Sequence, residues 1–171
     1  MKFIIFAITY FSVGMKKFIA IIILSIACGF AAKAKKSIEG YNEILAIVIT
    51  DIKCDAAVEC GDGRSCVMLS FGGYCDNEYF NGTVLPGAFD CQKTEQGATT
   101  LSARYVLKGR DRNNDECTIF IENNARAGAQ FSHPTIYTDS KALSFLNKPG
   151  LIGFLDNSGE FTIRIFAPAT Y

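Results

Sequence analysis

Short apolar stretches separated by turn residues recur along most of this chain. Residues 43–54 (EILAIVITDIKC) are rich in β-branched side chains and apolar at both alternating positions, whereas residues 99–108 (TTLSARYVLK) alternate. A hairpin is predicted over residues 150–168, with its turn at 157–159. Residues 139–148 (DSKALSFLNK) are the one segment that favours a helix, and it is short. The pattern predicts an all-β fold, an antiparallel barrel or sandwich of about eight strands, and we favour the barrel.

The first 34 residues predict a secretory signal peptide. Two lysines at 16–17 precede an apolar run, and residues 32–34 (AKA) supply the small-x-small pattern of a cleavage site. Residues 1–14 precede a signal that is already complete, and a start codon assigned too early explains these additional residues. An uncleaved anchor is one alternative and a lipid anchor on Cys28 another, but the lysines keep each apolar half below the ~20 residues of a membrane span. We therefore expect one secreted or periplasmic domain over residues 35–171, with no stable span after cleavage.

The distribution of charge argues against a nucleic-acid partner. The formal net charge of the whole chain is zero, and four of the 17 basic residues precede position 35, where no acidic residue lies. The mature domain is therefore mildly acidic, and it has no basic block interleaved with aromatic residues. Nucleic-acid binding requires clustered lysine and arginine, so we exclude that class.

Six cysteines follow the predicted cleavage site, and their even number in an exported chain predicts up to three disulfides. Fifteen connectivities are open, and the sequence does not choose among them. A zinc site is the alternative, but no Cys-x-x-Cys pair is present, so disulfides are favoured and no metal is predicted. The candidates are Cys54, Cys60, Cys66, Cys75, Cys91 and Cys117.

Three segments carry a resemblance to a known family. Residues 80–92 (FNGTVLPGAFDCQ), 101–109 (LSARYVLKG) and 119–128 (IFIENNARAG) resemble successive motifs of the bacterial and fungal domain of unknown function 3237, also called uncharacterised protein family 0311. The resemblance spans about residues 44–168 and implies a calycin-like β-barrel. It brings no settled activity, although the few roles associated with the family are cyclisations in secondary metabolism.

The chain departs from the family pattern at Ala88, Cys91 and Ala125. The family has a tryptophan where this chain has Cys91, so the resemblance also implies a changed pocket. It further suggests a disulfide from Cys91 to Cys66 or Cys117.

Asp90 matches the most distinctive acid of the family. A partly desolvated carboxylate can act as a general acid or base, but it can equally accept backbone N–H bonds and lock the turn after Pro86-Gly87. Arg104 and Tyr105 are adjacent on a predicted strand and point to opposite faces, so only one should share a face with Asp90. These three are the catalytic candidates, and a core tyrosine beside a surface arginine is the competing interpretation.

Asn123, Asn124 and Tyr137 are the candidate ligand-binding residues. The two amides could bind polar groups of a ligand or simply cap the chain, and Tyr137 matches an aromatic in a late loop of the family. His133 is the single histidine and is interpreted as a loop residue, since no Gly-x-Ser-x-Gly elbow accompanies it. No cofactor is predicted.

Three hypotheses follow. The chain is an exported barrel that binds a small organic molecule in its lumen, or a cofactor-free cyclase or isomerase that uses Asp90 with Arg104 or Tyr105. The third hypothesis is a disulfide-stabilised secreted structural or interaction domain with a packed lumen. A homodimer is compatible with each, and the lumen volume and the position of Asp90 distinguish them.

Overall fold

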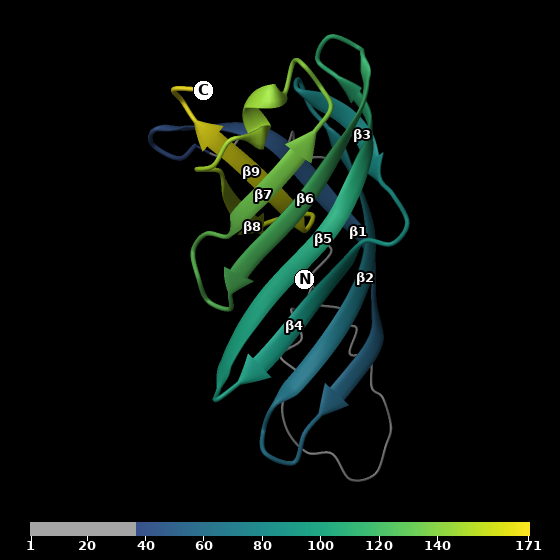
Figure 1. The fold of residues 1–171 in the computed structure, drawn as a ribbon, viewed down its shortest axis with the longest axis vertical. Coiled ribbons are helices and arrows are strands. Elements are labelled where there is room, and N and C mark those ends of the chain that lie inside the picture. The colour runs from purple at the N-terminus through teal and green to yellow at the C-terminus, as the bar shows by residue number, and fades with distance from the viewer. Residues whose placement is uncertain (1–36) are drawn as a thin grey trace, which may run out of the picture.

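Antiparallel strands make up almost all of the protein in the computed structural model, which describes residues 37–171 (Figure 1). The predicted signal peptide, residues 1–34, lies outside the described residues. One short 3-10 helix, η1, falls inside the predicted helical segment. The elements are β1 (Tyr41–Glu59), β2 (Ser65–Asp76), β3 (Phe80–Val84), β4 (Phe89–Glu95), β5 (Ala98–Asp111), β6 (Glu116–Arg126), β7 (His133–Thr138), η1 (Ser144–Asn147), β8 (Ile152–Asp156) and β9 (Thr162–Pro168).

The strands form a single sheet in the order β7-β6-β5-β3-β2-β1-β9-β8, and β4 also lies between β2 and β5. β3 and β4 therefore occupy one strand position in succession, separated by residues 85–88. Pro86 has no N–H to donate, and Gly87 has a positive φ of 98°, which interrupts the strand without reversing the chain. This interruption makes nine strands among the described residues where the sequence pattern predicted about eight.

The two ends of this strand order meet at one residue pair. Ser132, just before β7, forms an antiparallel bridge with Gly153 of β8, and both N···O distances are 2.9 Å. A side chain would be crowded there, because a Cβ at position 153 would lie 2.1 Å from Ser132 Oγ. The predicted all-β antiparallel fold is thus confirmed, with a barrel-like curvature of the sheet (Figure 1).

The hydrophobic core occupies the half of the sheet that η1 covers. Leu45, Ile119 and Ile165 are fully buried on strands there, and Leu146 of η1 packs onto the same cluster. Burying one such side chain contributes about 1.5–3 kcal/mol. In the other half, residues 51–59 of β1 are exposed and residues 65–70 of β2 are only half-buried. Figure 1 shows these strands continuing, with β4 and β5, beyond the core.

Candidate functional site

Asp90 lies on the face of the sheet that carries the core, which we call the inner face. Tyr105 of β5 and Ile121 of β6 are buried core residues that pair with each other. Side chains two residues apart on a strand share a face, so Ala103 and Asn123 are also inner. Asp90 pairs with Ala103, and Ala103 pairs with Asn123, which places an acid and an amide in one row on either side of a small residue.

Both carboxylate oxygens of Asp90 accept a hydrogen bond. Oδ1 accepts from the backbone N of Ser102 on β5 at 3.1 Å, and Oδ2 accepts from Gln92 Nε2 at 2.8 Å. The acid therefore links β4 to its neighbouring strand rather than locking the turn at Pro86-Gly87. Each carboxylate oxygen has a second lone pair, so the half-buried Asp90 can still accept a hydrogen bond from a ligand donor.

Tyr105 lies opposite the interruption between β3 and β4 and is 2 % exposed. Its ring packs edge-on against Phe71, with centroids 5.4 Å apart. Among the described residues its hydroxyl has no hydrogen-bond partner. Burial, with a smaller contribution from Cys75, raises the pKa of the Tyr105 phenol far above its usual range. The phenol therefore stays protonated and can donate one hydrogen bond and accept another.

Two more buried polar atoms on this face have no partner among the described residues. They are Oδ1 of Asn123, which is 6 % exposed, and Oγ of Ser132, which is 4 % exposed. Both side chains lie beside Gly153, where an added Cβ would be 3.4 Å from Asn123 Oδ1. Buried polar groups are nearly always hydrogen-bonded, so a group of unpartnered atoms on one face is a feature to be explained.

A hollow of about 190 Å³ adjoins Ser132. Most of its lining comes from residues 126–132, which connect β6 to β7. Leu101 and Ala125, the inner residues that follow Ala103 and Asn123 in the alternation, also line it, as does Leu155 of β8. Pockets for drug-sized ligands usually span about 300–1,000 Å³. The hollow therefore has room for a small molecule or for part of a larger one.

Arg104 lies on the opposite, outer face, as the alternation with Tyr105 requires. Its guanidinium forms two hydrogen bonds to Glu122, at 3.2 and 3.1 Å. Asn124 also donates to Glu122, and this bond, followed by those from Arg104, holds the pKa of Glu122 below its usual range. Tyr137 is 62 % exposed on this face and stacks on Phe120.

The structure thus divides the predicted site residues between two faces. Asp90, Tyr105 and Asn123 are brought together on the inner face, whereas the other three candidates, Arg104, Asn124 and Tyr137, lie on the outer face.

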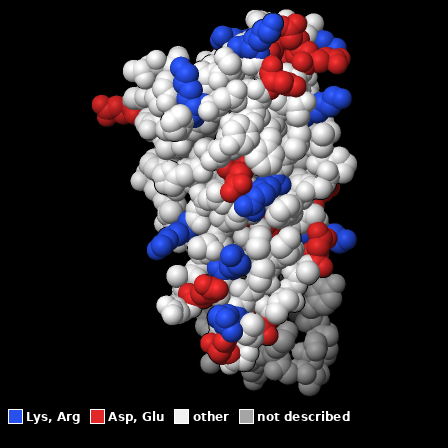
Figure 2. Space-filling model, viewed as in Figure 1, with Lys and Arg blue, Asp and Glu red and all other residues white. Residues whose placement is uncertain are grey.

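Acidic and basic residues are interspersed over the surface in Figure 2, with uncharged areas between them.

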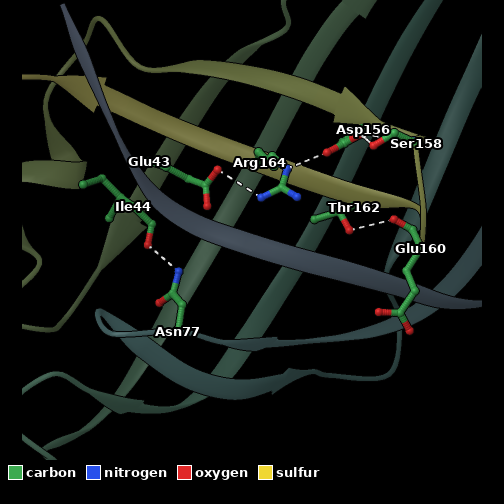
Figure 3. Close-up of polar contacts among 8 residues, drawn as sticks. All are labelled: Glu43, Ile44, Asn77, Asp156, Ser158, Glu160, Thr162 and Arg164. Carbon is green, nitrogen blue, oxygen red and sulfur yellow. Dashed lines mark hydrogen bonds and ion pairs between the residues drawn. The ribbon is translucent and has the colours of Figure 1, made fainter. Parts of the chain in front are cut away.

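A buried charge cluster was not predicted from the sequence. Figure 3 shows Arg164 of β9 between Glu43 of β1 and Asp156 of β8. Arg164 Nη1 lies 3.0 Å from Glu43 Oε2, and Nε lies 2.8 Å from Asp156 Oδ2. Burial raises the pKa of Asp156, but hydrogen bonds from Ser158 and Arg164 outweigh it and lower the pKa to about 2. The cluster joins three strands. Asp156 and Arg164 belong to one hairpin, but Glu43 is 121 positions from Arg164, so no local spacing could indicate the whole cluster.

The six cysteines occupy different surroundings. Cys75 and Cys117 are buried, Cys54 and Cys60 are exposed, and Cys66 and Cys91 are half-buried with their sulfur atoms 3.6 Å apart. Within residues 37–171, no group of three or more acidic, histidine or cysteine side chains is arranged to hold a metal ion. In the same part of the chain, no helix has the length and apolar character of a membrane span.

The strand order and pairing define an all-β, antiparallel, barrel-like class of protein. No family model matches the chain. Over 89 residues the chain is 36% identical to the UPF0311 protein of Clostridium acetobutylicum, a match that covers 49% of this chain and 52% of that protein. The match therefore spans about half of the relative's length, and it connects this chain with an uncharacterised family.

Solved structures support the same fold. A protein of unknown function from Clostridium acetobutylicum aligns over 74% of this chain and 93% of its own, with a TM-score of 0.59 and 24% identity. An enzyme from Penicillium herquei aligns over 79% and 98%, with a TM-score of 0.57 and 15% identity. A beta-barrel-like protein from Acinetobacter baumannii aligns over 77% and 98%, with a TM-score of 0.52 and 16% identity. At these identities the likeness concerns the fold alone.

Proposed function

We propose that this protein is an exported member of the domain of unknown function 3237 family, with a calycin-like barrel that binds a small organic molecule at its inner face. The observation that carries the proposal is the set of three buried, unpartnered polar atoms there: Tyr105 OH, Asn123 Oδ1 and Ser132 Oγ. Leaving each such group unpaired costs about 1–3 kcal/mol. A ligand that bonds to them recovers part of that cost, which is a source of affinity and of specificity.

The chemistry of these atoms defines the kind of ligand. Asn123 Oδ1 and Asp90 accept hydrogen bonds, whereas the hydroxyl groups of Tyr105 and Ser132 both donate and accept. Apolar contacts come from Leu101, which lines the hollow. The combination suits an uncharged molecule that presents hydroxyl groups on an apolar frame.

A cofactor-free cyclase or isomerase is the second candidate. The shared inner face of Asp90 and Tyr105 favours it, because an acceptor and a protonated phenol could act on one substrate. The similar fold of the Penicillium herquei enzyme is compatible with this role. Binding is the better-supported function, because both oxygens of Asp90 are engaged and Arg104 faces away.

Native mass spectrometry of the exported protein, compared with that of the variant Tyr105→Phe, tests the proposal. We expect a bound molecule in the wild-type protein, or one from a panel of hydroxylated metabolites, and about tenfold weaker binding in the variant. Without ligand, Tyr105→Phe should be at least as stable as the wild type, because it removes an unpartnered hydroxyl. Conversion of the bound molecule to a product would instead support the enzyme.

Tyr137→Phe is the matched control, since it removes the same hydroxyl from the exposed outer face. It should leave both affinity and stability unchanged. An empty wild-type protein that binds nothing from the panel would contradict the proposal and favour the structural-domain hypothesis.

The export component is checked on the same sample, because cleavage after Ala34 predicts a mature N-terminus at Lys35.

A further inference from the structure

Cys66 of β2 and Cys91 of β4 lie side by side on the outer face. Cys91 pairs with Met68, and Cys66 pairs with Lys93, so the two cysteines are diagonal neighbours on adjacent antiparallel strands. Sheet twist brings one of the two diagonals closer together. Their sulfur atoms are 3.6 Å apart, so a rotation of the side chains by about 1.5 Å at sulfur would reach the ~2 Å bond length of a disulfide.

Among the described residues, the two buried cysteines, Cys75 and Cys117, are too far apart to bond to each other. Cys75 and Cys117 lie in one inner row with Gly82 and Gly109 between them, which separates them by three strand spacings, about 14 Å. A disulfide requires Cα atoms within about 7 Å. Cys91 is on the outer face, and β5 separates its strand from that of Cys117. Of the two partners that the family resemblance suggested for Cys91, only Cys66 is therefore close.

The exposed cysteines leave one competitor. Cys54 pairs with Leu69 on the inner face, away from Cys66. Cys60 is in the turn after β1, where its N–H donates to the carbonyl oxygen of Arg64. It lies diagonally opposite Cys66 across the β1–β2 pair, on the side of β2 away from β4. Among the described residues, however, the thiol contact is between Cys66 and Cys91.

We propose that Cys66 and Cys91 form a disulfide that joins β2 to β4, while Cys117 remains reduced. The oxidant is a low-molecular-weight disulfide. One cysteine thiolate attacks a sulfur of that disulfide, which forms a mixed disulfide and releases one thiolate of the oxidant. The second cysteine thiolate then attacks the protein sulfur of the mixed disulfide and releases the other. Two protein thiols are oxidised, one disulfide is reduced to two thiols, and the two protons pass to the released thiolates.

The bond would close a loop that contains the β2–β3 turn and the interruption at residues 85–88. The two cysteines are 25 positions apart, and a loop of this length removes enough unfolded-state entropy to raise the melting temperature by about 10 °C. The bond would also fix the strand that carries Asp90, the residue before Cys91. Neither effect depends on a ligand, so the proposed binding function and this disulfide can fail separately.

The experiment uses the full-length protein, first reduced and then equilibrated with mixtures of oxidised and reduced glutathione at mildly alkaline pH. Remaining thiols are alkylated under denaturing conditions. The protein is digested with trypsin, which cuts after Arg64 and separates Cys60 from Cys66, and with chymotrypsin, which cuts after Phe71 and Phe89 and separates Cys66, Cys75 and Cys91. We expect one linked pair of peptides, Cys66 with Cys91, and alkylated Cys117. The melting temperature should rise on oxidation.

Two variants separate the outcomes. Cys91→Ser should abolish both the linked peptides and the rise in melting temperature, whereas Cys60→Ser should preserve both. A link from Cys60 to Cys66 in the wild-type protein would overturn the proposal. So would full alkylation of Cys66 and Cys91 after equilibration with the most oxidising mixture.

Discussion

At the residue scale, Arg164 holds two carboxylates in surroundings that exclude most solvent. The side chain of Arg164 is 9% exposed, as is that of Asp156. Removing one member of such a cluster leaves buried charge uncompensated, which usually costs about 3–5 kcal/mol. We therefore expect Arg164→Met to lower the free energy of unfolding at neutral pH by about 3 kcal/mol or more, measured by urea denaturation.

This loss should depend on pH in a defined direction. The folded-state pKa of Asp156, about 2, lies below the ~3.9 of an unfolded chain, so its contribution is present above pH ~4 and is lost as the pH falls through 2. The difference in free energy of unfolding between Arg164→Met and the wild type should therefore shrink as the pH falls from about 4 to about 2. Arg110→Met is the control, because its partner Glu116 is 71% exposed, and it should cost less than about 1 kcal/mol. Equal losses in both variants would contradict the role assigned to burial.

Local patterns in the sequence determined part of the candidate site. Alternation required Arg104 and Tyr105 to face opposite ways, and the structure bears this out. Which of them shares a face with Asp90 depends on the register between β4 and β5, a long-range property that the local pattern does not contain. Ser132 was missed for the same reason: it is unremarkable in sequence and acquires meaning only from its bridge to Gly153.

At the element scale, β7 and β8 are held together by the bridge between Ser132 and Gly153. A methyl group on Gly153 would collide with Ser132 Oγ, so Gly153→Ala should force the two strands apart. Overpacking of this kind costs about 1–3 kcal/mol, and we expect a loss in that range in chemical denaturation.

The double variant Gly153→Ala/Ser132→Ala tests the cause of that loss, because it removes the oxygen that the new methyl group would meet. The double variant should lose less free energy of unfolding than the sum of the two single losses, by at least about 0.5 kcal/mol. Simple additivity would mean that the two positions do not contact each other and that the edges do not meet there.

The strands were easier to predict than the way in which they share the sheet. Residues 43–54 are apolar on both faces, and β1 is indeed buried on both faces from Glu43 to Ile49. Pro86-Gly87, however, is typical of a turn between neighbouring strands. Here β3 and β4 continue one another between β2 and β5, because both flanking strands are long enough to pair with each piece in succession. Only the pairing of distant strands reveals this arrangement.

At the scale of the whole molecule, the sheet has a buried half and an exposed half, and the two should differ in local stability. Backbone amides open at a free energy that reflects the burial around them. Hydrogen exchange followed by mass spectrometry should therefore show slow exchange for residues 44–49 and 163–166, which are buried. Residues 51–59, exposed along their whole length, should exchange faster although they belong to the same strand as 44–49.

The same measurement connects this division with the inner site. Asp90 and Ala103 lie in the less buried half, so a molecule bound beside them should slow exchange in β4 and in the first part of β5. Oxidation of Cys66 and Cys91 should slow exchange in β2 and β4 without any ligand. Uniformly slow exchange along β1 would contradict the division, since it would mean that the exposed half unfolds only with the core.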